Sequence, residues 1–252
     1  MNARALFCSV AFSPSVFNTV SATQVRQAWR DACVRWGRPH GTRLDNGCPW
    51  GNWSELPTAL PLWLEGIDVH VDFIPPRRPE HNGVVERSNG TTQAWVEVHT
   101  CETHQEVQSR LEWSDQMQRE EYPHACGKSR GELFPALRHS GREYSAEWEQ
   151  DNWDLRKAQE YLAGCVACRQ VCIRGRVKLY ARSYCVGLSH KGERVAVQYD
   201  PEDGQWLFCG TDGTEWCRRP AEQITRERIL ALDISDTVPN SQRGKKAARQ
   251  NL

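Results

Sequence analysis

Two carboxylates in this chain stand at positions from which a side chain can act on a bound ligand. Asp45 directly follows a predicted strand, Gly41–Leu44, and precedes Asn46-Gly47. At the carboxyl end of a parallel strand, a carboxylate points into the crevice where α/β sheets place their ligands. Glu86 lies near the start of a predicted helix, where the helix dipole favours negative charge. Taken singly, Asp45 is also a good turn residue, and Glu86 can also be a solvated charge on a helix. The two carboxylates together are therefore a stronger indication of a functional site than either one alone.

The elements before Asp45 predict an α/β arrangement. Leu6–Phe12 is apolar, which predicts a buried strand. Apolar residues then recur at helical spacing over Val25–Trp36, with Ser21 or Thr23 available as the N-cap. The strand Gly41–Leu44 follows. Strand, helix and strand in this order predict a right-handed crossover and a parallel strand pair.

The next part of the chain predicts helices and one strand. Leu56–Leu64 predicts a short helix, and Val69–Phe73 alternates apolar with polar residues, as a half-buried strand does. After the stiff, basic connection Pro75–Pro79, Val84–Val98 predicts the helix that contains Glu86. Further predictions are a helix capped by Thr103 and Glu106 that runs to about Glu120, a loop from Tyr122, and a helix over Ser145–Gly164.

After Gly164 the pattern changes to short strands separated by glycine-containing turns. The predicted strands are Val171–Leu179, Tyr184–Leu188, Glu193–Tyr199, Gln205–Cys209 and Thr214–Arg218. Five such strands predict a small antiparallel barrel. Trp206 and Trp216 are predicted as barrel core rather than as stacking platforms. Ala221–Leu232 predicts a closing helix.

The composition, with 39% hydrophobic and 25% charged residues among 252, predicts a globular chain with one large core or two smaller ones. It has neither a long apolar run nor a secretory signal, so we expect a cytoplasmic protein without membrane spans. The formal net charge is zero, yet residues 165–252 hold 15 Lys and Arg against 10 Asp and Glu, and residues 1–164 hold 17 against 22. This asymmetry suits a metal-binding core joined to a nucleic-acid-binding module.

Eleven cysteines occur at irregular spacings, which does not predict a disulfide framework. Cys165, Cys168 and Cys172 are similar to part of a zinc motif, but a fourth ligand at a fitting spacing is not evident. We therefore expect no zinc site.

Three strings around the two carboxylates match a known family closely. They are Gly37-Arg38-Pro39, Arg43-Leu44-Asp45-Asn46-Gly47 and Pro79-Glu80-His81-Asn82-Gly83-Val84-Val85-Glu86-Arg87. Tyr122-Pro123-His124 is similar to that family's aromatic-rich segment ending in Pro-His. Over about residues 5–232, the chain therefore resembles the integrase-core DDE transposases of bacterial insertion sequences.

The resemblance implies a ribonuclease-H-like fold and metal-dependent cleavage and joining of DNA strands. Asp45 and Glu86 would be the second Asp and the Glu of the family's three-carboxylate site, and would ligate Mg²⁺ or Mn²⁺. Carboxylate oxygens suit these hard cations, and a metal pair can stabilise both the attacking and the leaving oxygen of phosphoryl transfer. The implied partners are DNA, as transposon ends and target, and further copies of the chain or a full-length transposase.

The first Asp of the family has no match in this sequence. In the family it lies further before the second Asp than Met1 lies before Asp45. Asp31 falls on a predicted helix, and Asp68 and Asp72 follow Asp45. We therefore expect an N-terminally incomplete core with little or no transposition activity and an exposed sheet edge.

Polar and basic residues in two regions are candidates for DNA contact. Near the carboxylates, phosphate or sugar contacts are predicted for Arg77, Arg78, Arg87, Asn89 and Gln93. Early in the barrel, contacts along a DNA backbone are predicted for Arg174, Arg176, Lys178 and Arg182. The alternative for each residue is a solvated surface side chain.

The predicted domains are a partial ribonuclease-H-like integrase core over 1–142, a linker helix over 143–164, a small β-barrel over 165–232 and a basic disordered tail over 233–252. The leading hypothesis is a transposase or integrase-type protein that is catalytically impaired because the first Asp is absent. The alternatives are a non-catalytic DNA-binding or inhibitory transposase fragment and a decayed relic.

Overall fold

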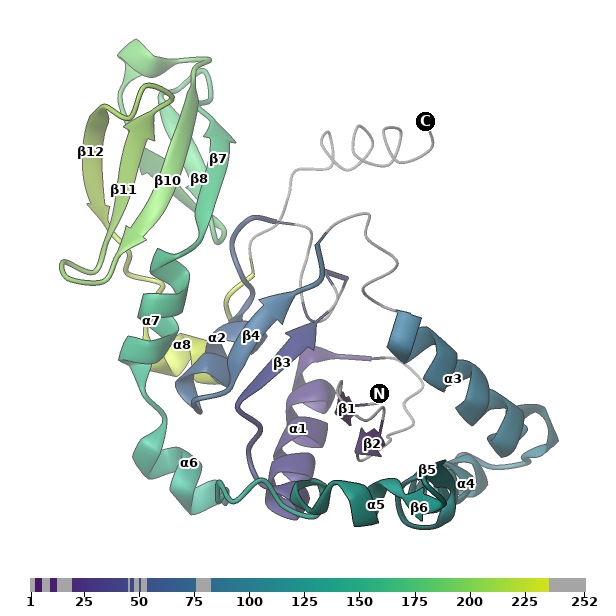
Figure 1. Ribbon diagram of the computed structural model, residues 1–252. Helices are drawn as coiled ribbons and strands as arrows, with labels where there is room; N and C mark the ends of the chain where they lie inside the picture. The colour runs from purple at the N-terminus through teal and green to yellow at the C-terminus, as the bar shows by residue number, and fades with distance from the viewer. Residues whose placement is uncertain are drawn as a thin grey trace. The chain divides into compact units, whose positions relative to one another are not determined.

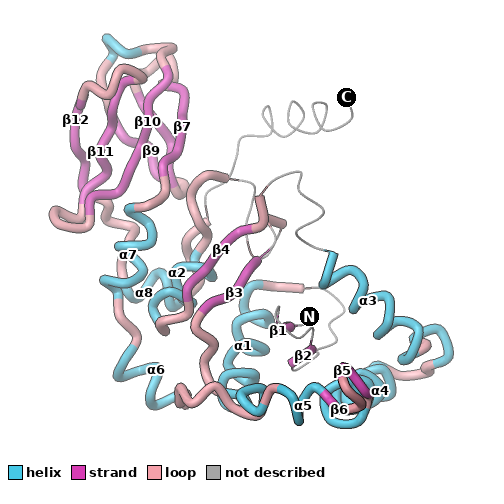
Figure 2. Tube along the Cα trace, viewed as in Figure 1, coloured by secondary structure: helices cyan, strands magenta, loops and turns pink. Residues whose placement is uncertain are grey.

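The computed structural model describes residues 3–5, 10–12, 20–44, 46–47, 50, 54–75 and 83–235. It is a mixed α/β structure with small sheets, and the chain forms two compact units (Figure 1, Figure 2). Unit 1 comprises Met1–Arg43 and Asp72–Asp151, and unit 2 comprises Leu44–Val71 and Asn152–Leu252. No helix in the described part of the chain has the length and apolarity needed to cross a membrane.

The predicted parallel pairing of the first strand with β3 (Gly41–Leu44) is wrong. β2 (Val10–Phe12) pairs antiparallel with β1 (Ala3–Ala5), and β3 pairs with β4 (His70–Phe73). In Figure 1 the arrows of β3 and β4 run in the same direction, and α2 (Ala59–Gly66) lies between them in the chain. The strand–helix–strand unit is therefore β3–α2–β4, because a short apolar run indicates a strand without indicating its partner.

Helix α1 (Ala22–Trp36) begins and ends where its sequence predicts. Ser21 Oγ accepts a hydrogen bond from the Gln24 N–H, and the Gln24 side chain accepts one from the Ser21 N–H, which completes a capping box. Gly37 ends the helix at φ 75°, and a Cβ there would lie 2.3 Å from Ser140 Oγ. The buried face consists of the apolar residues Val25, Ala28, Trp29, Ala32 and Cys33.

The rest of unit 1 is mostly helical. Its elements are α3 (Gly83–Val96), η2 (Val98–Thr100), α4 (His104–Gln116), the π-helical η3 (Met117–Glu121), β5 (Pro123–Ala125), β6 (Lys128–Ser129), α5 (Arg130–Leu133), η4 (Pro135–Leu137) and α6 (Ala146–Asn152). The predicted cap of α4 is confirmed, since Thr103 accepts from the Glu106 N–H. The loop predicted from Tyr122 is instead the β5–β6 hairpin, because Cys126 and Gly127 take the positive φ angles that a tight turn needs.

An ionic contact joins α1 to α6 inside unit 1. Arg30 donates two hydrogen bonds to the Glu149 carboxylate, at 2.6 and 2.9 Å. The Tyr144 hydroxyl donates to the same carboxylate. Burial, together with Glu149, raises the pKa of the Tyr144 hydroxyl, so this group stays protonated and keeps its donor.

Helix α2 is the buried centre of unit 2. All its residues are buried, and α7 (Leu155–Ala163) and α8 (Arg226–Leu230) pack on it. Trp153 donates its Nε1–H to the Trp63 carbonyl at 3.1 Å. Its ring occupies the space beside Gly66, where a Cβ would lie 2.2 Å from the indole.

Two predicted helices are divided or shortened. The helix predicted over Ser145–Gly164 is α6 and α7, because Asp154 accepts from the Arg156 N–H and starts a new helix. The closing helix predicted over Ala221–Leu232 is reduced to α8, which Thr225 caps. Side chains of these types favour caps over helix interiors because they bond nearby backbone groups.

Six of the described strands form an antiparallel region, residues 166–220, called here the β module. They are β7 (Val166–Gln170), β8 (Arg176–Leu179), β9 (Arg182–Cys185), β10 (Arg194–Asp200), β11 (Gln205–Gly210) and β12 (Glu215–Pro220). The sheet β12–β11–β10–β7 and the hairpin β8–β9 take the place of the closed barrel that the sequence predicts. The predicted strand Val171–Leu179 is broken at Cys172–Gly175, where Gly175 has φ 64°.

Aromatic side chains fill the interior of the β module. Trp206 and Phe208 have no exposed surface, and the Trp206 ring lies 5.9 Å from Tyr180. The prediction of Trp206 as core is therefore confirmed. Trp216 is only partly buried, and it stacks on His190 at 3.7 Å between ring centroids.

The β module is bonded to the segment that leads into α2. Arg169 donates to Glu55 at 2.6 Å and to Ser54 at 3.1 Å, and the Tyr180 hydroxyl donates to the Pro57 carbonyl at 2.7 Å. Tyr180 is buried. The module is thus one body with α2 inside unit 2, rather than an appendage on a free linker.

Gly66→Ala is expected to destabilise the protein by about 1–3 kcal/mol, as overpacking does, because the Trp153 ring is held by its hydrogen bond to Trp63 and cannot yield. Gly90→Ala is the control: it lies within α3 with nothing within 4 Å of the added Cβ. It should stabilise by up to about 1 kcal/mol through helix propensity. Urea unfolding measures both, and a stabilising Gly66→Ala would contradict the contact.

Candidate functional site

Asp45, Arg77 and Arg78 lie outside the described residues. β3 ends at Leu44, so Asp45 is the residue that follows this strand in the chain. Its role therefore stays a prediction.

Glu86 lies in the first turn of α3, and its side chain is exposed. The other predicted contact residues of this helix are exposed as well: Arg87, Asn89 and Gln93. The buried stripe of the same helix consists of Ser88, Thr92 and Val96, each four residues from the next. The helix ends two residues before the predicted Val98, since Glu97 has φ 48°. α3 thus presents the predicted polar residues to solvent.

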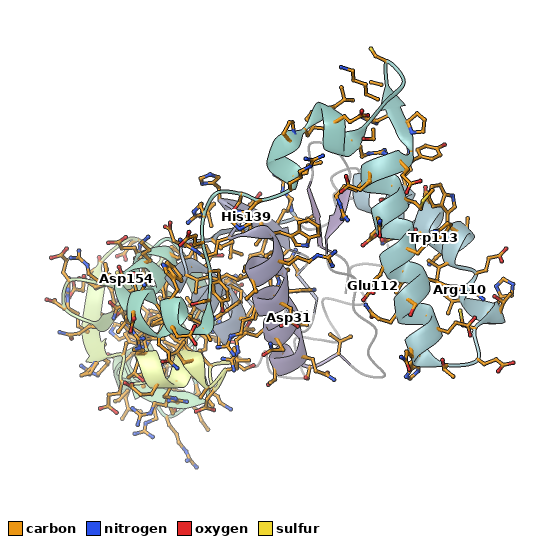
Figure 3. The ribbon with its side chains drawn as sticks, turned by 90° about the horizontal axis from the view of Figure 1, so that it is seen from below. Asp31, Arg110, Glu112, Trp113, His139 and Asp154 are labelled. Atoms are coloured by element: carbon orange, nitrogen blue, oxygen red, sulfur yellow. The ribbon has the colours of Figure 1, made fainter. Side chains whose placement is uncertain are left out.

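Arg110 of α4 fastens the carboxyl end of α3. Its guanidinium donates to the Val96 carbonyl at 3.2 Å, to Thr100 Oγ1 at 2.6 Å and to Glu106 at 2.6 Å. Figure 3 shows Arg110 and Trp113 on α4, which runs beside α3. Arg110 therefore holds the carboxyl end of α3, whereas Glu86 lies at the amino end of the same helix.

The acids that the sequence analysis sets aside have surroundings of their own. Asp31 is exposed on α1. Asp72 pairs with Arg43 at 3.0 Å, and Asp68 pairs with Lys157. Within the described ranges, no group of three His, Cys, Asp or Glu side chains is placed to hold a metal ion. Because Asp45 lies outside these ranges, the metal site that the resemblance implies for Asp45 and Glu86 stays a prediction.

The hairpin β8–β9 separates apolar from basic side chains. Arg176 and Lys178 are exposed, whereas Val177 and Leu179 are buried, as the period of a strand requires. Arg174, in the preceding turn, is also exposed. Arg182, on β9, is exposed too, so the structure places all four predicted basic residues on the surface of one hairpin and its turn.

The fourth residue, Arg182, differs because it pairs with Glu222. Arg174, Arg176 and Lys178 form no ion pair with any described residue. Their charges are therefore more available to a polyanion than that of Arg182.

The three closely spaced cysteines have unlike surroundings. Cys165 donates to the Tyr161 carbonyl at 3.6 Å, and burial raises the pKa of its thiol to about 11. Cys172 is exposed, and hydrogen bonds from the backbone N–H groups of Arg174 and Arg176 lower the pKa of its thiol. They do not form a metal-binding group.

Arg38, in the Gly37-Arg38-Pro39 string, has a packing role in unit 1. Its guanidinium lies 3.7 Å from the centre of the Trp148 ring and donates to the Glu143 carbonyl at 2.9 Å. The side chain is buried. Arg38 of this string therefore stabilises the packing of α1 against α6 through a cation–π contact with Trp148.

Tyr122, the first residue of the Tyr122-Pro123-His124 segment, lies in an aromatic cluster of unit 1. Its ring is 5.3 Å from Trp95, which in turn lies 6.2 Å from Trp113. Tyr122 and Trp113 are each about half exposed. This segment thus packs against the end of α3, the helix that contains Glu86.

Glu65 is a buried carboxylate that the sequence analysis does not single out. It accepts from the Val71 N–H at 2.7 Å and lies 3.2 Å from His70 Nδ1. Burial raises its pKa, against the lowering effect of the Val71 hydrogen bond. The sequence does not indicate this burial, because a Glu that follows the apolar run Leu60–Leu64 has the pattern of a solvated charge at a helix end.

Comparisons with known proteins do not settle the family. A search of protein families finds no match to this chain. Among solved structures, the chain is similar to one from the simian T-cell lymphotropic virus intasome in complex with the PP2A regulatory subunit B56 gamma. The TM-score is 0.39 and the identity 13%, over 89% of this chain and 67% of that chain. A TM-score of this size does not establish a shared fold.

Glu65→Gln is expected to raise stability relative to the wild type as pH increases. A carboxyl whose folded-state pKa is raised favours folding at low pH, and this contribution is lost as pH rises from the ordinary 4.5 through the folded pKa. Gln keeps the oxygen that accepts from Val71. The free energy of unfolding in urea, measured from pH 4 to pH 7, should show a gap that widens in favour of the variant.

The control is Glu160→Gln, which removes an exposed carboxylate from the same unit. Repeating the series in His70→Asn removes the ionisable neighbour of Glu65, so that a gap which persists there belongs to Glu65. A gap that is constant with pH in both backgrounds would contradict a raised pKa for Glu65.

Proposed function

We propose that this chain is a transposase or integrase-type protein of the DDE class, with a ribonuclease-H-like core and a DNA-binding β module. The observation that carries the proposal is where Asp45 falls in the sequence relative to β3 and where Glu86 lies on α3. Asp45 follows β3, and the exposed Glu86 lies in the first turn of α3, within the strings that resemble this family. The exposed Arg87, Asn89 and Gln93 support DNA contact on the same helix.

Catalysis by this chain alone is expected to be impaired. In the family, Mg²⁺ or Mn²⁺ bound by three carboxylates supplies the charge stabilisation for phosphoryl transfer. These 252 residues contain matches for two of the three, Asp45 and Glu86. The residues of this chain would therefore bind and orient DNA more readily than they would cleave it.

A second candidate function is that of a non-catalytic DNA-binding or inhibitory transposase fragment. The observation that favours it is the exposed charge of Arg174, Arg176 and Lys178 on the β module, which form no ion pair with any described residue. Such a chain would bind DNA as a multimer or join a full-length transposase and occupy its place.

DNA binding is expected to depend on the charges of the β8 strand. The double variant Arg176→Gln with Lys178→Gln should bind a fluorescent duplex more weakly. It should also lower the slope of log affinity against log salt by about 2, since each phosphate contact contributes about 0.9. Fluorescence anisotropy from low to physiological salt measures this. Arg156→Gln on α7, which is 81% exposed, is the control and should match the wild type. No binding by the wild type at low salt would sink the proposal.

Nicking of supercoiled plasmid in Mn²⁺ tests whether the chain alone is catalytically impaired. The chain alone is expected to nick no more than its Glu86→Gln variant, because removing one carboxylate from an incomplete site changes nothing further. DNA binding without nicking is the outcome that the proposed impairment predicts. Nicking by the wild type that Glu86→Gln abolishes would show that the chain is catalytically competent, contrary to the impairment proposed above.

A further inference from the structure

Two turns meet at one end of the β module. They are Cys172–Gly175, between β7 and β8, and Gly187–Lys191, between β9 and β10. The Gly175 carbonyl accepts from the N–H groups of Val186 and Gly187, at 2.9 and 3.2 Å. A Cβ on Gly175 would lie 2.5 Å from the Gly187 carbonyl oxygen, so the two backbones touch. These contacts hold the two turns together as one surface, called here the tip.

The tip exposes two large aliphatic side chains. Ile173 is 78% exposed and Leu188 is 71% exposed, more than any other large hydrophobic residue in the described part of the chain. Each sits on one of the two joined turns. Exposed apolar side chains on a hydrogen-bonded turn cannot fold back into the core, so they are available to a ligand.

The charges around these side chains are mainly positive. Exposed residues at the tip without an ion pair to any described residue are Arg174, Arg176, Lys191 and Arg194. The acidic side chains at this end have local partners: Glu193 faces His190 at 3.5 Å, Glu215 pairs with Arg218 at 3.1 Å, and Asp212 accepts from Thr214 at 2.8 Å. The four cations outnumber Glu193 and Asp212, the two of these carboxylates without an Arg or Lys partner among the described residues, so this end of the module favours a polyanion.

We propose that the tip binds duplex DNA through the minor groove, with Ile173 and Leu188 as apolar contacts and Arg174 and Lys191 on the flanking phosphates. This rests on the proposed function and deepens it by assigning a binding mode. Proteins that bend DNA insert aliphatic side chains between base steps from the minor groove while basic residues hold the backbone. A lipid surface also accepts apolar and basic groups, but the tip offers only two aliphatic side chains, which is little apolar area for anchoring.

The test uses the full chain and a duplex that has a donor and an acceptor dye at its ends. Ile173→Ser with Leu188→Ser should weaken binding about a hundredfold, since each aliphatic side chain that is no longer buried costs about tenfold. The double variant should also lose the rise in energy transfer that reports DNA bending. The salt slope should stay unchanged because no phosphate contact is removed.

Val166→Ser is the matched control. Val166 is 49% exposed on the same module, at the opposite end of β7 from the tip. This variant should bind and bend DNA as the wild type does. Because all three substitutions are on the surface, circular dichroism and thermal unfolding should show folded proteins throughout.

The outcomes separate this inference from the proposed function. Wild-type affinity and bending in the double Ser variant would overturn the tip as a contact, while salt-dependent binding would leave the proposed function standing. Failure of the wild type to bind DNA would overturn both. Binding to anionic phosphatidylserine vesicles in place of DNA, lost in the double Ser variant, would assign the tip to a membrane surface instead.

Alkylation of Cys172 gives an independent readout. This exposed cysteine lies in the first turn of the tip, and Cys126 is exposed in unit 1. Mass spectrometry of the iodoacetamide-treated protein should show that bound duplex slows modification of Cys172 several-fold but not that of Cys126. Equal rates at Cys172 with and without saturating DNA would contradict contact at the tip.

Discussion

The indole of Trp153 lies against Gly66 and donates to the Trp63 carbonyl, and unit 2 depends on this contact between residues 90 positions apart. It requires glycine at the end of α2, because a side chain would overlap the ring. α2 is wholly buried, and the chain enters it from Leu44 and leaves it towards Val71. The contact therefore holds in place the helix between the strand that precedes Asp45 and the strand that follows.

The β module is bonded to the same region. Arg169 donates a hydrogen bond to Glu55 and Tyr180 donates one to the Pro57 carbonyl, so the module is joined to the residues just before α2. The tip lies at one end of this module, and its cations lack described partners. The DNA contact that we propose for the tip therefore belongs to the same compact unit as α2. The acidic Glu86 belongs to unit 1, where Arg110 and α4 support its helix.

Features of the fold that arise from short-range interactions could be predicted. Ser21 and Thr103 cap their helices through hydrogen bonds that span three residues, and the face of α1 follows from its apolar period. Strand pairing could not be predicted in the same way. β3 pairs with β4 rather than with the first strand, and β8 and β9 form their own hairpin. A period indicates which face of a strand is buried but does not indicate which strand lies beside it.

The same distinction between local and long-range interactions applies to the candidate site. The sequence by itself determined which residue types stand at Asp45 and Glu86, and which residues alternate with the buried side chains of β8. Only the tertiary structure decided that Glu65 is buried, that Arg182 pairs with Glu222 whereas Arg176 has no ion pair with a described residue, and that the turns of Ile173 and Leu188 meet. The physical reason is that burial and ion pairing depend on residues distant in sequence, which local patterns do not report.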